Sequence, residues 1–172
     1  MADRRAGGAP AGEVLPPGLR QGARPLPRWA ALLGGAAQCL WGLPQTLAGL
    51  AAYAVCRAAG CPGACWRGRV VTVWRRKAGA SLGLFLFVPG DPAPDARLLV
   101  HEYGHSVQSL ALGPLYLPVI FLPSACWLAL PPLRRLRRET GRSYYDFYTE
   151  RWANRWGEKA TGCPAMGRAR ID

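Results

Sequence analysis

Histidine is scarce in this chain, which has only two among 172 residues. A metal site with three histidines is therefore excluded, and a third ligand would have to be a carboxylate or a thiolate. Acidic residues are also few, ten against 22 lysines and arginines, so the carboxylate candidates can be considered one by one. The six cysteines lack the two matched pairs of a zinc knuckle. No internal repeat is present, which argues against a repeat architecture.

The formal charge of +12 would suggest nucleic acid as the partner of a soluble protein. Half of the residues are hydrophobic, however, and residues 29–56 and 106–133 carry no charge. We therefore expect a lipid bilayer containing anionic lipid as the partner, and no nucleic acid. Segment 29–56 is predicted to be a transmembrane helix, or two half-length helices interrupted near Pro44. Segment 115–133 is expected to span the membrane, re-enter it or lie at its surface.

Composition also sets the expected domain limits. Residues 1–27 are rich in Ala, Gly, Pro and Arg, which predicts a disordered basic arm. Residues 28–159 are expected to form one membrane-embedded domain, and residues 160–172 a flexible tail. Within that domain, Cys61 and Cys65 are close enough in sequence to pair in an oxidising compartment.

Both histidines fall in the pentad His101-Glu102-Tyr103-Gly104-His105. The surrounding pattern predicts a helix over 95–112, with Asp95 as its N-cap and Gly113-Pro114 as its stop. On a helix the two imidazoles share one face, as a tetrahedral zinc ion requires, and Glu102 can act as general base. Gly104 is unfavourable inside a helix, which indicates either a close approach to its backbone or helix packing.

A β-hairpin is expected over residues 69–88. Residues 69–74 and 81–88 are β-branched or aromatic runs, and a polar loop joins them. The edge of this hairpin could receive an extended peptide, or the hairpin could simply cover the metal helix.

The third metal ligand is expected in the C-terminal part of the chain. Glu139 lies in a basic run, where an ion pair is the simplest role. Glu150 lies in an aromatic-rich segment predicted as a helix over 143–156 and ended by Gly157. Asn154 follows one turn later, where it can orient a histidine ligand. Asp146 is the next candidate.

With these residues in place, the chain resembles the gluzincin, or thermolysin-like, zinc metallopeptidases. The resemblance implies His101, His105 and Glu150 as zinc ligands, Glu102 as base and Asn154 as the residue that orients a histidine. The family pattern has Asp where this chain has Asn154. Residues 38–157 also resemble a group of small, mostly uncharacterised bacterial membrane proteins, through Ser81-Leu82-Gly83, Gly113-Pro114-Leu115-Tyr116-Leu117 and Tyr148-Thr149-Glu150-Arg151-Trp152-Ala153-Asn154. That likeness implies an integral protein of the bacterial cell membrane.

These observations predict a mainly α membrane protein with a small β-hairpin. Its zincin-like core would pack on one or two hydrophobic segments. The expected activity is zinc-dependent hydrolysis of a peptide or membrane-protein substrate. One of four tyrosines would stabilise the oxyanion: Tyr103, Tyr144, Tyr145 or Tyr148. The alternatives are a non-catalytic membrane protein with a structural zinc site, or an envelope scaffold.

Overall fold

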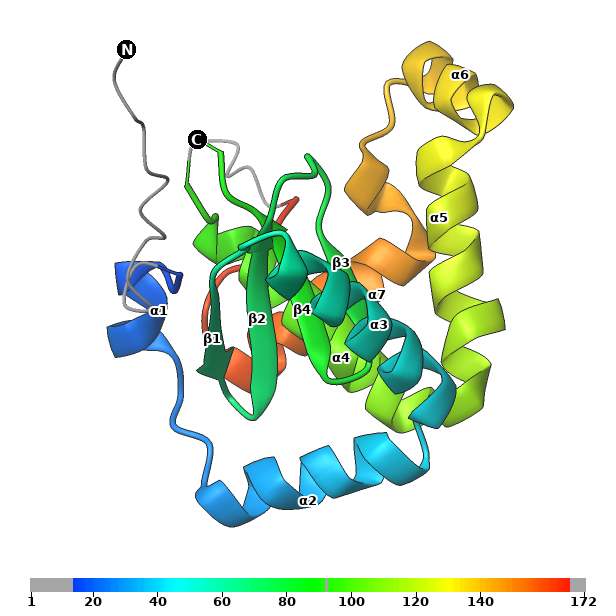
Figure 1. The fold of residues 1–172 in the computed structure, drawn as a ribbon. Coiled ribbons are helices and arrows are strands. Elements are labelled where there is room, and N and C mark those ends of the chain that lie inside the picture. The colour runs from blue at the N-terminus through cyan, green and yellow to red at the C-terminus, as the bar shows by residue number, and fades with distance from the viewer. Residues whose placement is uncertain (1–13, 92, 168–172) are drawn as a thin grey trace, which may run out of the picture.

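The computed structural model describes residues 14–91 and 93–167 and is mainly helical, with one small sheet (Figure 1). The α-helices are α1 (Pro17–Gly22), α2 (Arg28–Leu40), α3 (Leu43–Ala58), α4 (Ala96–Leu112), α5 (Leu122–Ala129), α6 (Pro131–Thr140) and α7 (Tyr148–Thr161). Short helical turns are η2 (Gly113–Leu115), the π-helix η3 (Leu117–Phe121) and η4 (Tyr144–Asp146). The strands are β1 (Gly63–Trp66), β2 (Arg69–Trp74), β3 (Ala80–Leu82) and β4 (Phe85–Pro89).

The four strands form a mixed sheet in the order β1-β2-β4-β3, so the hairpin expected over 69–88 is wrong. Strands β2 and β4 pair in parallel, and β3 pairs antiparallel with β4. Gly83 has a φ of 62°, which allows a tight turn and divides the second predicted strand into β3 and β4. Strand β4 then lies between β2 and β3. Another hairpin joins β1 to β2 through Arg67 and Gly68, both with positive φ.

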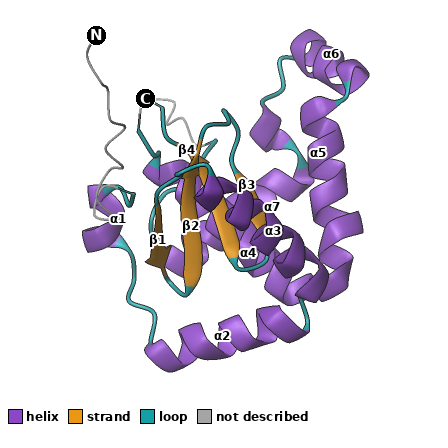
Figure 2. Cartoon of the chain, in the orientation of Figure 1, coloured by secondary structure: helices purple, strands orange, loops and turns teal. Residues whose placement is uncertain are grey.

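Helices cover both faces of the sheet (Figure 2). Phe85 on β4 contacts Tyr53 on α3, with ring centroids 5.3 Å apart. The adjacent Leu86 belongs to the core shared with Leu99 on α4. Side chains alternate along a strand, so a central strand covered on both faces needs a continuous apolar run, which residues 85–88 supply.

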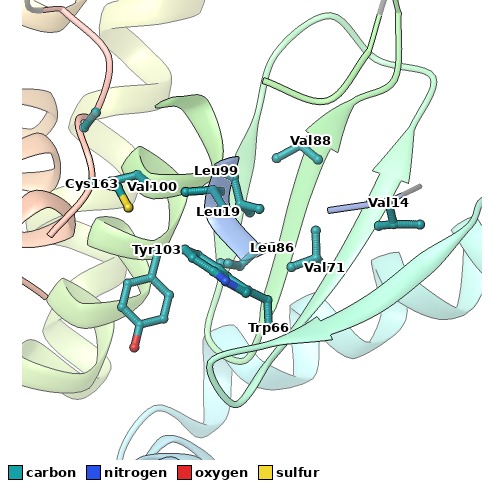
Figure 3. Close-up of a cluster of buried hydrophobic side chains, with 11 residues drawn as sticks. Val14, Leu19, Trp66, Val71, Leu86, Val88, Leu99, Val100, Tyr103 and Cys163 are labelled. Carbon is teal, nitrogen blue, oxygen red and sulfur yellow. The ribbon is translucent and has the colours of Figure 1, made fainter. Parts of the chain in front are cut away.

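The main hydrophobic cluster lies between the sheet, α4 and the two chain ends (Figure 3). It includes Val14 and Leu19 near the N-terminus and Cys163 near the C-terminus. Arg24 N–H also donates to the Thr161 carbonyl, at 2.7 Å. The predicted disordered arm and flexible tail are therefore wrong for residues 14–27 and 160–167. Average composition does not reveal that these segments contain apolar side chains that pack into the core. The remaining parts of the predicted arm and tail, residues 1–13 and 168–172, lie outside the described residues.

Segment 29–56 forms two half-length helices, α2 and α3, which is one of the two forms expected for it. The break falls at Trp41-Gly42, and Pro44 lies in the first turn of α3. In the described part of the chain, no single helix is long and apolar enough to cross a bilayer. Two bent pairs meet the length and composition criteria when each is taken together: α2 with α3, bent by 99°, and α4–η2 with η3–α5, bent by 119°.

Buried polar contacts attach the α2–α3 elbow to α4. The amides of Gln38 and Gln45 both donate to the Ser109 hydroxyl, and Gln45 also donates to the Gly113 carbonyl at 2.9 Å. Both glutamine side chains are fully buried, so their hydrogen bonds fix where the elbow sits on α4.

Candidate metal centre

Helix α4 has the ends that its sequence predicts. The Asp95 side chain accepts a hydrogen bond from Arg97 N–H at 2.7 Å, and Gly113 closes the helix with a φ of 55°. Residues 99–106 are all buried, including the whole histidine pentad. The pentad therefore lies in the interior of the protein, where a buried polar group requires a partner.

Two glycines allow α4 and α7 to pack unusually closely. A Cβ at Gly104 would overlap the carbonyl oxygen of Ala153, and one at Gly157 would overlap the carbonyl oxygen of Val100. The two explanations given for Gly104 therefore describe one contact, because the close approach to its backbone is made by the packed helix α7. Gly157 does not end the helix as predicted, because α7 continues to Thr161 and Gly162 provides the left-handed cap. This close crossing brings Glu150 on α7 to the histidines of α4.

His101, His105 and Glu150 converge on one point. Their candidate ligand atoms all lie within 4.8 Å of one another, and the three residues are buried. Glu150 Oε2 lies 3.1 Å from His101 Nε2 and 3.5 Å from His105 Nε2. Among the described residues, this oxygen has no hydrogen-bond partner. This buried group could hold a metal ion.

The other nitrogen of each imidazole faces an amide oxygen. His101 Nδ1 lies 2.7 Å from Asn154 Oδ1, and His105 Nδ1 lies 2.7 Å from Gln108 Oε1. An amide oxygen can only accept, so each Nδ1 must carry the proton. In the neutral rings both Nε2 lone pairs then point toward the Glu150 carboxylate. Three electron-rich atoms in such proximity repel one another unless a cation lies between them, which is the condition that a metal satisfies.

The second oxygen of Glu150 is held by hydroxyl groups. Ser124 on α5 donates to Glu150 Oε1 at 2.5 Å, and Thr149 donates at 3.0 Å. Tyr144 lies 2.8 Å from the Ser124 hydroxyl, and the Ser124 proton is already used, so Tyr144 donates in this pair. Glu150 thus has one oxygen fixed by donors and the other directed at the histidines.

The two carboxylates of the site have opposite pKa shifts. Burial raises the pKa of Glu150, but the positive charge and N–H groups that His105 and His101 present when both of their ring nitrogens carry protons outweigh burial and hold it well below its usual range. Burial is also the main reason that the pKa of Glu102 is raised to about 8; His101 opposes this effect and Glu150 adds to it. A divalent cation beside Glu102 would lower its pKa again, because an opposite charge favours the carboxylate.

A cavity of about 500 Å³ opens beside the triad. Glu102 lines it, and Glu102 Oε2 is buried without a partner among the described residues. The loop after β2 passes closely over this carboxylate, since a Cβ at Gly79 would overlap Glu102 Oε1. The remaining walls are mostly aromatic or apolar, from Leu98, Tyr116, Phe121, Ala125, Leu128, Tyr144 and Tyr145.

Only two of the four tyrosines expected near the oxyanion line the cavity. Tyr103 packs on the opposite side, in the hydrophobic cluster with Trp66 (Figure 3). Tyr148 donates its hydroxyl to the Val119 carbonyl, at 2.7 Å, and is not part of the wall. Tyr144 is engaged with Ser124, and Tyr145 lies edge-on to His101, with ring centroids 5.3 Å apart. Burial and the nearby carboxylates raise the pKa of Tyr145 to about 12, so its hydroxyl keeps its proton at neutral pH.

The other candidate ligands have different roles. Asp146 accepts a hydrogen bond from Ser143 N–H at 2.7 Å and caps η4, and Glu139 pairs with Arg135 at 2.7 Å on α6. All six cysteines are free, so the possible Cys61–Cys65 bond is not formed.

Sequence patterns did not identify three residues of the site: Gln108, Ser124 and Thr149. Gln108 was detectable in principle, since it follows His105 by three positions on the same helix, as Asn154 follows Glu150 by four. Ser124 was not, because its position depends on how α5 packs against α7.

No family model, curated protein or solved structure matches this chain at a significant level. The function of the protein must therefore be inferred from the geometry of its site and the pattern of its sequence.

Proposed function

We propose that this protein is a zinc-dependent metallopeptidase of the membrane. The proposal is carried by one observation: two imidazole Nε2 atoms and Glu150 Oε2 converge beside a cavity that is also lined by Glu102, whose Oε2 is buried without a partner among the described residues. Two histidines and one carboxylate are a common ligand set for catalytic zinc. The neutral imidazoles and hard carboxylate oxygen suit zinc better than calcium or magnesium, which favour oxygen ligands alone.

Zinc held by these residues would acidify a water molecule to a pKa of about 7 and polarise the scissile carbonyl. With zinc bound, Glu102 would accept a proton from that water and could return it to the leaving amine. The Tyr145 hydroxyl forms no hydrogen bond with the described residues, and we assign it to the developing oxyanion. Asn154 and Gln108 hold the two imidazoles in the tautomer that presents Nε2.

The arrangement favours catalysis over a structural zinc site. A structural site is closed by four protein ligands, whereas His101, His105 and Glu150 form a set of three in the described part of the chain. The open side faces a cavity of about 500 Å³, within the size range of small-ligand sites. Strand β3 does not favour strand addition by a substrate, because the Ser81 carbonyl already accepts from Tyr116 at 3.0 Å. We therefore propose that the cavity itself holds the peptide.

The bilayer remains our proposed location. Large apolar side chains are strongly exposed on α2, where Leu32 is 74% and Leu40 is 83% exposed. Further exposed apolar residues lie on α3, η3 and α5. Helix α6 adds four arginines next to this surface, which is the charge that anionic lipid would attract. We attribute the exposure of large apolar side chains on these four elements to contact with lipid.

Metal analysis of the detergent-purified full chain tests the proposal first. We expect about one equivalent of zinc, and loss of most of it in His101→Ala and in His105→Ala. Glu102→Gln should keep the zinc and abolish cleavage of a peptide library, because an amide cannot accept the proton. Full zinc retention in both histidine variants would refute the site. Unchanged cleavage in Glu102→Gln would refute the assignment of the base and favour a structural zinc protein.

A further inference from the structure

Two cations line the mouth of the cavity without an acidic partner. Arg76 and Lys77 belong to the cavity wall, and both are exposed in the loop between β2 and β3, at the upper end of the sheet in Figure 1. Of the described residues, the acidic ones that line the cavity are Glu102 and Glu150, and both belong to the candidate metal centre. Among the described residues, neither Arg76 nor Lys77 forms an ion pair.

The loop that carries these cations is held in place. Trp74 Nε1 donates to the Ala78 carbonyl at 2.9 Å, which closes the loop across its base. The Trp74 ring stacks on Phe87 of the central strand, with centroids 5.0 Å apart. The Arg76 guanidinium lies 5.6 Å from the centre of the Trp74 ring, a cation–π distance. Arg76 is therefore positioned by the sheet, at less entropic cost than a free surface arginine would incur on binding.

Part of the cavity lining is apolar. Leu98 comes from α4, Phe121 from η3 and Leu128 from α5. A ligand that fills the cavity therefore meets the buried candidate metal ligands, apolar side chains and the positive charge of the exposed residues Arg76 and Lys77. A volume of about 500 Å³ corresponds to a sphere about 10 Å across, or about three extended residues at ~3.3 Å each. A short peptide can thus reach the metal centre and the mouth at the same time.

We infer that the site selects acidic peptides, with Arg76 and Lys77 receiving a substrate carboxylate within about three residues of the scissile bond. This inference rests on the proposed peptidase function and specifies its substrate class. Arg76 and Lys77 act as specificity-determining residues at the mouth and take no part in bond cleavage. An exposed pair of opposite charges contributes about 0.2–1 kcal/mol, which corresponds to about a 1.5- to 5-fold preference for each cation.

Metal-directed probes test this directly. A hydroxamate group chelates zinc, so a set of peptide hydroxamates can carry glutamate one, two or three residues from that group, each matched with its glutamine version. Binding to the zinc-loaded full chain in detergent is then measured by fluorescence anisotropy. We expect at least one glutamate probe to bind several-fold more tightly than its glutamine partner, and this preference to shrink between low and high salt.

The loop itself provides the matched control. Arg76→Gln and Lys77→Gln should each reduce the preference for glutamate about 1.5- to 5-fold, and together about 10-fold. Arg75→Gln removes the same charge from an exposed neighbour that does not line the cavity, so it should leave the preference nearly unchanged.

Four outcomes would overturn the inference. Equal binding of every glutamate and glutamine pair would show that the mouth does not select charge, although the peptidase proposal would stand. An equal effect of Arg75→Gln and Arg76→Gln would show a general field and no specific contact. If Arg76→Gln and Lys77→Gln weaken only binding to vesicles containing anionic phospholipid, the loop is a membrane contact. If no hydroxamate binds at all, the metal site fails, and this inference fails with it.

Discussion

Gln108 connects the two helices that supply the candidate metal ligands. Its side chain is fully buried, and its oxygen lies 2.7 Å from His105 Nδ1. Its amide group donates to the Thr149 carbonyl on α7 at 3.1 Å, one residue before Glu150. A single side chain therefore orients one ligand and positions the segment that carries another. Replacing Gln108 should affect metal binding and folding stability separately.

Gln108→Met keeps an unbranched side chain of similar size and removes both hydrogen bonds. Loss of the group that orients His105 should weaken zinc binding about 10- to 100-fold, or about 1.4–2.7 kcal/mol. The metal-free protein should also lose about 0.5–1.5 kcal/mol of unfolding free energy, because the hydrogen bond from Gln108 to the buried Thr149 carbonyl is lost. Zinc affinity is measured by competition with a chromophoric chelator, and stability by denaturant unfolding without metal.

Gln108→Glu separates the two effects. The carboxylate still accepts from His105 Nδ1–H, so zinc affinity should stay near that of the original protein or rise. It can no longer donate to Thr149 when ionised, so stability should fall as in Gln108→Met. If Gln108→Met binds zinc with unchanged affinity, Gln108 does not orient His105 in the metal-bound protein, and our account of the tautomer is refuted.

Three further predictions concern the ligand helix and the membrane surface. Asn154→Ala should weaken zinc binding about 10- to 100-fold and Asn154→Asp should strengthen it, both by chelator competition; weaker binding in Asn154→Asp would contradict the proposed role. Gly157→Ala should cost about 1–3 kcal/mol of unfolding free energy and weaken zinc binding, because the new methyl group forces α7 away from α4. Gly35→Ala is the control: a Cβ at this position meets open space, so the substitution should not destabilise the protein. Segment 29–56 should keep the protein in the membrane fraction at high salt, because salt screens charge and not apolar burial; release by salt alone would show a peripheral protein.

The bounds of helix α4 could be predicted from the sequence because the signals that set them are local. Asp95 as the cap, Gly113 as the stop and the four-residue spacing of the histidines all act within one or two turns. The nearness of Glu150 was also predictable, although it depends on a partner helix, because few carboxylates compete for the role. Its distance from the histidines required the structure, since it depends on how closely α4 and α7 cross.

The errors concern features determined by distant parts of the chain. The apolar runs at 69–74 and 81–88 are strands, but strand type does not determine pairing, and β4 inserts between β2 and β3. Gly157 has the pattern of a helix stop, yet it serves a close helix contact, and Gly162 is the true cap. Val14 and Leu19 lie in a segment whose average composition suggests disorder, but single apolar residues are sufficient to attach it to the core.

The amide at Asn154 is easier to understand beside Gln108 than as a departure from a carboxylate pattern. Both histidines are oriented by neutral amide oxygens at 2.7 Å, so the two halves of the site are chemically matched. Glu150 is then the one full negative charge among the ligands and their orienting groups, and it is fully buried. With a divalent metal this set carries a net charge of about +1, whereas a carboxylate at Asn154 would reduce it to about zero. A less basic imidazole and a higher net charge leave the metal more electron-poor. Orientation of the histidines by the neutral amides of Asn154 and Gln108 would therefore lower the affinity for the metal and increase the power of the metal to polarise a bound water or carbonyl group. This combination is compatible with a catalytic site.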